Sequence, residues 1–205
     1  MTKDLILAEL ERHQDLLLPH TAAHLSESNL DVGCGSGVAS LVHAARLGLS
    51  PTLCDVVDIR HAQARALPFR LIDGRTLPFH EQSFGSSYLQ YVLHHLPGVD
   101  AIVCLLTECA RVSATVVIVE EVTGPKTDIS RARAFDRETN AYLHPGVLMP
   151  VFRYFSPAGV NAQLSAAGAS LVGHAVVSVG SRENGWLETH VFVGSAPGAR
   201  TDPRR

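Results

Sequence analysis

The sequence has few of the features that mark membrane, secreted or nucleic-acid-binding proteins. No uninterrupted apolar run approaches the roughly 20 residues of a membrane span, and the charged N-terminal stretch is unlike a secretory signal. The four cysteines show neither C-x-x-C spacing nor the density of a disulfide framework, so we expect reduced thiols and a cytoplasmic protein. A formal net charge of -3 gives no general reason to expect nucleic-acid binding, which normally selects a basic surface.

The remaining composition is that of one packed domain. Apolar residues make up 46% of the 205 residues and charged residues 18%, which excludes wholesale disorder. We see no internal repeat and expect no metal, because His20 and His24 share a helical spacing but lack a third ligand nearby. An amphipathic helix is predicted over 3–18, interrupted at Pro19, with a second short helix over 20–26.

Residues 29–38, which read N-L-D-V-G-C-G-S-G-V, organise the chain. A short apolar run ends in Asp31, three glycines follow at alternate positions, and an apolar helical pattern begins at Val38. This predicts a strand, a tight glycine turn and a helix, the opening half of an α/β nucleotide-binding unit. The dinucleotide fingerprint G-x-G-x-x-G does not fit, because Val38 and Ser40 occupy the places where either register needs its third glycine.

The segment L-D-V-G-C-G-S-G resembles motif I of the class I S-adenosylmethionine-dependent methyltransferases. Three further signals follow in the family's order: an acid at Asp55, the D-G-R-T-L-P-F segment from Asp73 to Phe79, and V-L-H-H-L from Val92 to Leu96. The resemblance implies a Rossmann-like three-layer α/β sandwich with a mostly parallel, seven-stranded sheet. That sheet ends in an antiparallel hairpin, for which Asn184-Gly185 is a turn signal.

The implied cofactor is S-adenosyl-L-methionine, with S-adenosyl-L-homocysteine as product. Asp55 lies 18 positions after Gly37, close to the separation at which α/β sites place a ribose-binding carboxylate, and Asp58 is the competing acid. The resemblance assigns Asp73 to adenine, and Gln90 and Tyr91 to the methionine side of the cleft. The predicted cofactor residues are Asp31, Gly33, Cys34, Gly35, Gly37, Asp55, Val56, Asp73, Gly74, Gln90 and Tyr91.

Four residues are candidates for a general base: His94, His95, Glu121 and His144. The two adjacent histidines follow the fourth predicted strand, where ligands bind in open α/β sheets, although a structural role at the turn is equally open. Glu120 and Glu121 end the fifth strand, where they either orient an acceptor or are solvated at a loop entrance. A base is needed only for a poorly ionised hydroxyl or a protonated amine.

The chain divides into an N-terminal helical lid (1–28), a cofactor-binding domain (29–196) and a disordered tail (197–205). Residues 123–155 form an insertion at the place where the family builds its acceptor site. Its candidate pocket residues are Tyr142, His144, Met149, Phe152 and Tyr154. The alternative is a loop folded against the sheet edge, with Phe152 and Phe155 in the core.

The predicted reaction is methyl transfer to an O, N or C nucleophile of a small-molecule acceptor, lipid-like or a secondary metabolite. One alternative is a protein that kept the cofactor and lost methyl transfer, as a cyclase or regulatory module. A nicotinamide-dependent oxidoreductase is the other. We expect no nucleic-acid partner and no membrane span, and a monomer or homodimer.

Overall fold

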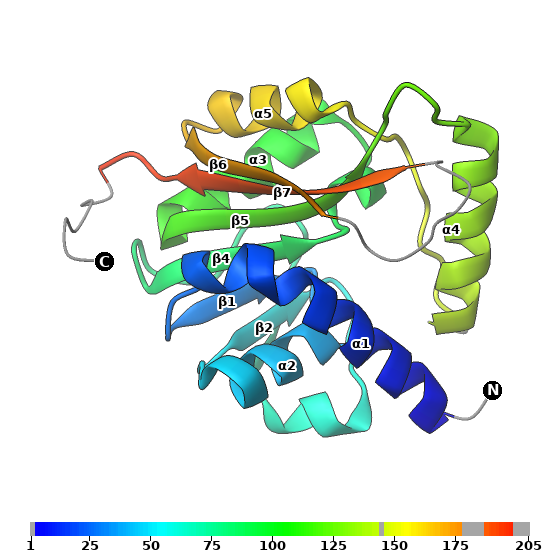
Figure 1. Cartoon of the computed structure of the whole chain (residues 1–205). Helices are drawn as coiled ribbons and strands as arrows, with labels where there is room; N and C mark the ends of the chain where they lie inside the picture. The colour runs from blue at the N-terminus through cyan, green and yellow to red at the C-terminus, as the bar shows by residue number, and fades with distance from the viewer. Residues whose placement is uncertain (1–2, 144–145, 178–186, 199–205) are drawn as a thin grey trace.

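A seven-stranded sheet forms the centre of the molecule, with strand order β3-β2-β1-β4-β5-β7-β6. The computed structural model describes residues 3–143, 146–177 and 187–198 (Figure 1). The strands are β1 (Asn29–Val32), β2 (Thr52–Asp55), β3 (Phe69–Leu71), β4 (Phe84–Gln90), β5 (Ser113–Val122), β6 (Ser170–Val177) and β7 (Glu188–Ser195). Only β7 runs antiparallel to its neighbours, so the predicted architecture is confirmed.

Helices cover both faces of this sheet (Figure 1). On one face lie α1 (Lys3–Thr21) and α2 (Val38–Leu47), and on the other α3 (Val99–Val112) and α5 (Pro157–Ala166). The 3-10 turns are η1 (Ala22–His24), η2 (Ala62–Ala66) and η3 (Leu93–His95). Helix α4 (Ile129–Leu143) stands beyond the ends of the strands rather than on either face. Among the described residues, no helix is both long and apolar enough to cross a membrane.

The predicted interruption at Pro19 is wrong, because α1 continues through this residue to Thr21. Pro19 has no backbone N–H, but it lies in the last turn of α1. There the missing donor removes a single helical hydrogen bond. The Thr21 hydroxyl donates to the Leu17 carbonyl at 3.2 Å in the same turn. The predicted second helix is reduced to the short turn η1.

Three expectations fall outside the described residues. They are the role of His144, the turn at Asn184-Gly185 and the last seven residues of the tail.

A buried ion pair joins β5 to the turn that follows β4. Glu120, in β5, has no exposed surface, and its carboxylate accepts hydrogen bonds from His94 Nδ1 at 2.6 Å and from the Leu93 amide at 2.8 Å. Burial alone would lower the pKa of His94, but the charge and hydrogen bond of Glu120 raise this pKa to about 9. His94 is therefore an imidazolium at neutral pH, and the pair fixes η3 to the centre of the sheet.

The Glu120→Gln variant should unfold more easily than the wild type, because it leaves the His94 cation buried without a counter-charge. We expect a loss of about 3–5 kcal/mol in the free energy of unfolding, measured by urea denaturation at pH 7. The control is Glu9→Gln, which removes the exposed ion pair with Arg12 and should change stability by less than about 1 kcal/mol.

The same pair predicts a pH dependence. Because the pKa of His94 is raised in the folded state, its contribution is complete below the ordinary histidine value of about 6.5 and is lost as pH rises through about 9. The stability of the Glu120→Gln variant should not show this decrease at alkaline pH. Equal stability of wild type and variant at pH 7 would contradict the assignment.

Candidate functional site

The candidate site lies at the carboxyl ends of β1 and β4, next to each other in the sheet. The chain builds β2 and β3 on one side of β1, and β4 and the later strands on the other. The strand order therefore reverses between β1 and β4, and open α/β sheets bind ligands in a crevice outside the strand ends at such a reversal.

The glycine loop after β1 is shaped by positive φ angles of 71° at Gly33, 52° at Gly35 and 73° at Gly37. A Cβ atom on Gly33 would lie 2.8 Å from Val92 Cγ2, and one on Gly37 would lie 2.7 Å from the Ala64 Cβ. These two glycines are therefore required by packing as well as by backbone conformation.

Asp55, the last residue of β2, holds this loop from the side. Its carboxylate accepts hydrogen bonds from the Gly35 amide at 2.8 Å and from the Val56 amide at 2.7 Å. Burial raises the pKa of Asp55, and the amides oppose that rise. The competing acid, Asp58, is instead engaged by the Arg60 guanidinium through two hydrogen bonds, at 2.9 Å each.

Two other residues of the predicted cofactor set are buried within the loop. Asp31 accepts a hydrogen bond from the Ser40 hydroxyl at 2.7 Å, and burial raises the pKa of Asp31 to about 7. Burial also raises the pKa of the Cys34 thiol, so this cysteine is neutral. Both side chains are therefore enclosed by the protein, and Asp31 connects β1 to the start of α2.

The ends of β2 and β3 together present an apolar surface. The Val56 side chain is 58% exposed, and a Cβ atom on Gly74 would lie 3.1 Å from Val56 Cγ1. Beside them, Asp73 accepts hydrogen bonds from the Thr76 amide at 2.7 Å and the Arg75 amide at 2.8 Å, which stabilises its own turn. The exposed Val56 side chain is suited to contact the apolar face of a flat ring, and the Asp73 carboxylate is suited to contact a polar group on its edge.

On the other side of the crevice, Gln90 ends β4 and Tyr91 follows it directly. Gln90 Oε1 accepts a hydrogen bond from the Tyr88 hydroxyl at 2.9 Å. The Tyr91 hydroxyl lies 2.9 Å from His13 Nε2, on helix α1. Sequence reasoning missed His13, because no local pattern connects residues that lie 78 positions apart.

Three of the four candidate bases, His94, His95 and Glu121, lie close together around η3. The Nδ1 of His95 donates to the Pro150 carbonyl at 2.9 Å, and burial together with the neighbouring His94 cation lowers the pKa of His95 to about 4. Glu120 and Glu121 lie inside β5 and are both buried, so the expectation of solvated acids at a loop entrance is wrong. A longer pairing of β5 with β7, which extends to Val122, encloses them.

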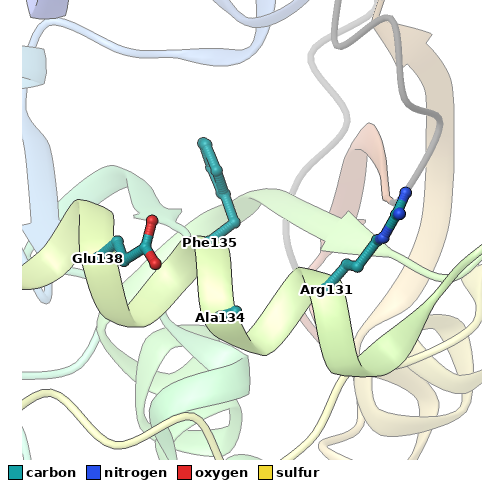
Figure 2. Close-up of a pocket in the computed structure, with 4 residues that line it drawn as sticks. All are labelled: Arg131, Ala134, Phe135 and Glu138. Atoms are coloured by element: carbon teal, nitrogen blue, oxygen red, sulfur yellow. The ribbon is translucent and has the colours of Figure 1, made fainter.

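Helix α4 brings a separate group of residues to the same end of the sheet. Its buried stripe contains Ala132 and Asp136, and Asp136 accepts a hydrogen bond from the Tyr154 hydroxyl. A neighbouring stripe lines a cavity of about 210 Å³ with Arg131, Ala134, Phe135 and Glu138 (Figure 2). Figure 2 shows the Phe135 ring projecting from the helix, with Glu138 one turn later and Arg131 one turn earlier.

The predicted acceptor residues are divided by the structure. Phe155 joins the main core, as the alternative interpretation predicts, whereas Phe152 is largely exposed. Tyr154 is half-buried on Asp136, and Met149 lies in the segment that follows α4. The side chain of Tyr142 lies outside the described residues, as does His144.

Comparison with known proteins gives one family match in sequence. Residues 30–115, from β1 to the start of β5, match the model of a family described as "Methyltransferase domain". No curated protein matches the chain.

Several solved structures share the fold. An S-adenosylmethionine-dependent methyltransferase of Methanosarcina mazei is 20% identical, with a TM-score of 0.69 over 87% of this chain and 97% of that one. The geranyl diphosphate C-methyltransferase of Streptomyces coelicolor A3(2), in complex with S-adenosyl-L-homocysteine, is 12% identical, with a TM-score of 0.66 over 93% and 82%. The [4+2]-cyclase SpnF is 17% identical, with a TM-score of 0.65 over 91% and 81%.

The family match covers the glycine loop, Asp55, Asp73 and the β4 segment, and the fold extends over the remaining strands. Residues 30–115 therefore match a methyltransferase domain, and the chain has the Rossmann-like fold of S-adenosylmethionine-dependent methyltransferases.

Proposed function

We propose that this protein is an S-adenosylmethionine-dependent methyltransferase whose small-molecule acceptor binds between the cofactor edge of the sheet and helix α4. The observation that carries the proposal is the cavity on α4, placed at the carboxyl ends of the strands (Figures 1 and 2). Small-molecule sites combine apolar walls with a few placed polar groups. Phe135, 36% exposed, supplies the apolar wall, and Arg131 and Glu138 supply charges of opposite sign.

The residues at the crevice fit the three parts of S-adenosylmethionine. The Asp55 carboxylate already accepts hydrogen bonds from three backbone amides, and its remaining lone pair suits the vicinal ribose hydroxyls. Val56, Gly74 and Asp73 suit the adenine ring, and the glycine loop with Gln90 and Tyr91 suits the methionine part. The bound cofactor supplies an electrophilic methyl group on a sulfonium.

The protein's contribution to transfer is then alignment of the acceptor with that methyl group. Holding two reactants in line at near-attack distance removes much of the barrier of a bimolecular displacement. Geranyl diphosphate, the acceptor named for the Streptomyces enzyme, is a lipid-like molecule, which supports an acceptor of that kind. A cytoplasmic location and a monomeric or homodimeric state are part of the same proposal.

A second candidate is a protein that binds the cofactor and catalyses a cyclisation. It is favoured by the shared fold with a [4+2]-cyclase. A nicotinamide oxidoreductase is less favoured, because Ser40 occupies a position of the missing third glycine and its hydroxyl is committed to Asp31.

The distinguishing experiment is incubation with S-adenosylmethionine labelled in its methyl group and a panel of phenols, amines, carboxylic acids and isoprenoid diphosphates. Label recovered in a small-molecule product supports the proposal. Micromolar cofactor binding by calorimetry with no label transfer to any panel member would favour the second candidate.

Asp55→Asn should weaken binding of S-adenosyl-L-homocysteine by about 1–3 kcal/mol, since the amide that replaces one oxygen cannot accept a hydrogen bond. The measurement is calorimetric titration of the purified protein. Asp58→Asn is the matched control, because Asp58 lies three residues away and is paired with Arg60. Equal affinities of the two variants would remove Asp55 from the cofactor site.

Phe135→Ala should raise the KM for the acceptor found in the panel by roughly tenfold and leave cofactor affinity unchanged, because it removes the apolar wall of the cavity. Ile129→Ala is the control, since Ile129 is similarly exposed on α4 but does not line the cavity. Steady-state kinetics on both variants test this. Equal KM values would place the acceptor elsewhere.

A further inference from the structure

The backbone conformation of Tyr91 is unusual for an aromatic residue. Tyr91 follows β4 directly and has a φ of 58°, a region that residues with a Cβ seldom adopt. Backbone conformations of this kind are strained and are concentrated at functional sites. Gln82 is the other such residue in the described chain, and its side-chain amide lies 3.3–3.5 Å from three backbone carbonyl oxygens, which gives it a structural explanation.

Tyr91 connects the end of β4 to both the sheet and helix α1. Its amide donates to the Val119 carbonyl at 2.8 Å, and the next residue, Val92, packs against Gly33 of the glycine loop. Its hydroxyl meets His13 Nε2 at 2.9 Å, and the two rings are tilted by 43°. The contact between His13 and Tyr91 thus connects helix α1 to the methionine side of the proposed cofactor site.

The histidines of η3 are poorly suited to remove a proton from an acceptor. His94 is a buried cation paired with Glu120, so it has no lone pair to offer. His95 has a pKa lowered to about 4, which makes it a weak base. His13 is only partly buried, and a proton that it takes up can leave to solvent.

We propose that Tyr91 and His13 form a proton relay for a hydroxyl acceptor, an inference that rests on the proposed methyl transfer. The acceptor O–H gives its proton to the Tyr91 oxygen while Tyr91 gives its own proton to Nε2 of neutral His13. The acceptor oxygen forms a bond to the methyl carbon, and the carbon–sulfur bond breaks with its electrons on sulfur. The products are a methyl ether, S-adenosyl-L-homocysteine and a His13 imidazolium, which then releases its proton.

A phenolic acceptor matches this relay, because its acidity is close to that of tyrosine and the exchange of protons is then nearly balanced. The charged group beside His13 on its own helix is Glu9, itself bonded to Arg12, and its carboxylate favours the imidazolium. From β4, the titratable group that faces His13 is Tyr91.

The test compares His13→Gln and Tyr91→Phe with wild type, using 4-methylphenol and 4-nitrophenol as acceptors and labelled S-adenosylmethionine. Glutamine can still accept the hydrogen bond of Tyr91 but cannot take its proton. With 4-methylphenol we expect kcat to fall by on the order of 10²-fold in both variants, with calorimetric cofactor binding unchanged in His13→Gln. With 4-nitrophenol, which ionises readily near neutral pH, the loss should be much smaller.

The control is His24→Gln, an exposed histidine of η1, which should behave as wild type. The acid limb of the wild-type pH profile with 4-methylphenol should disappear in His13→Gln. Full activity of His13→Gln, or an equal loss with both phenols, would overturn the relay and leave His13 a positioning residue. Wild-type methylation of amines or carbon acids without either phenol would also overturn it, while the proposed methyl transfer would stand.

Discussion

The hydrogen bond from the Gly35 amide to the Asp55 carboxylate is the contact on which the cofactor edge depends. It connects the loop after β1 to the end of β2, and the same carboxylate also fixes the Val56 amide. The amides of Gly33 and Cys34 donate to the Cys54 carbonyl, which joins the start of the loop to β2, and Asp55 binds the amide of the next glycine, Gly35. Asp55 therefore performs two tasks, because it orders the glycine loop before any ligand arrives and keeps a lone pair for one.

A second constraint explains why two prominent histidines are unsuited to act as bases. Glu120 is wholly buried in β5, and a buried carboxylate needs a counter-charge and donors, which His94 and the Leu93 amide provide. The backbone carbonyl of His94 then accepts the Phe152 amide, and His95 holds the Pro150 carbonyl. The turn after β4 thus anchors the segment that follows α4, and the proposed proton transfer falls to Tyr91 and His13 instead of the two histidines of η3.

The sequence is most informative where the determinants are local. The glycine spacing, the separation of Asp55 from Gly37 and the alternation of strands and helices correctly predict the sheet and its helical layers. The errors arise where distant segments meet. Glu120 and Glu121 are enclosed because β5 pairs with β7, about 70 positions away along the chain, and a single-sequence pattern does not contain that register. His13 and Tyr91 are likewise brought together only by the packing of α1 on the sheet.

The proposed acceptor site is built differently from the proposed cofactor site. Helix α4 is anchored through its buried stripe, in which Asp136 accepts a hydrogen bond from the Tyr154 hydroxyl. At the start of the helix, the Asp128 carboxylate accepts hydrogen bonds from the Ser130 and Arg131 amides. One residue belongs to both groups, because Arg131 lines the cavity and also pairs with Asp128 at the start of the helix. Substitutions on the cavity stripe leave the Asp55 contacts intact, since those contacts lie on other elements. In the proposed function, the acceptor and the methyl donor are thus held by separate sets of side chains on different elements.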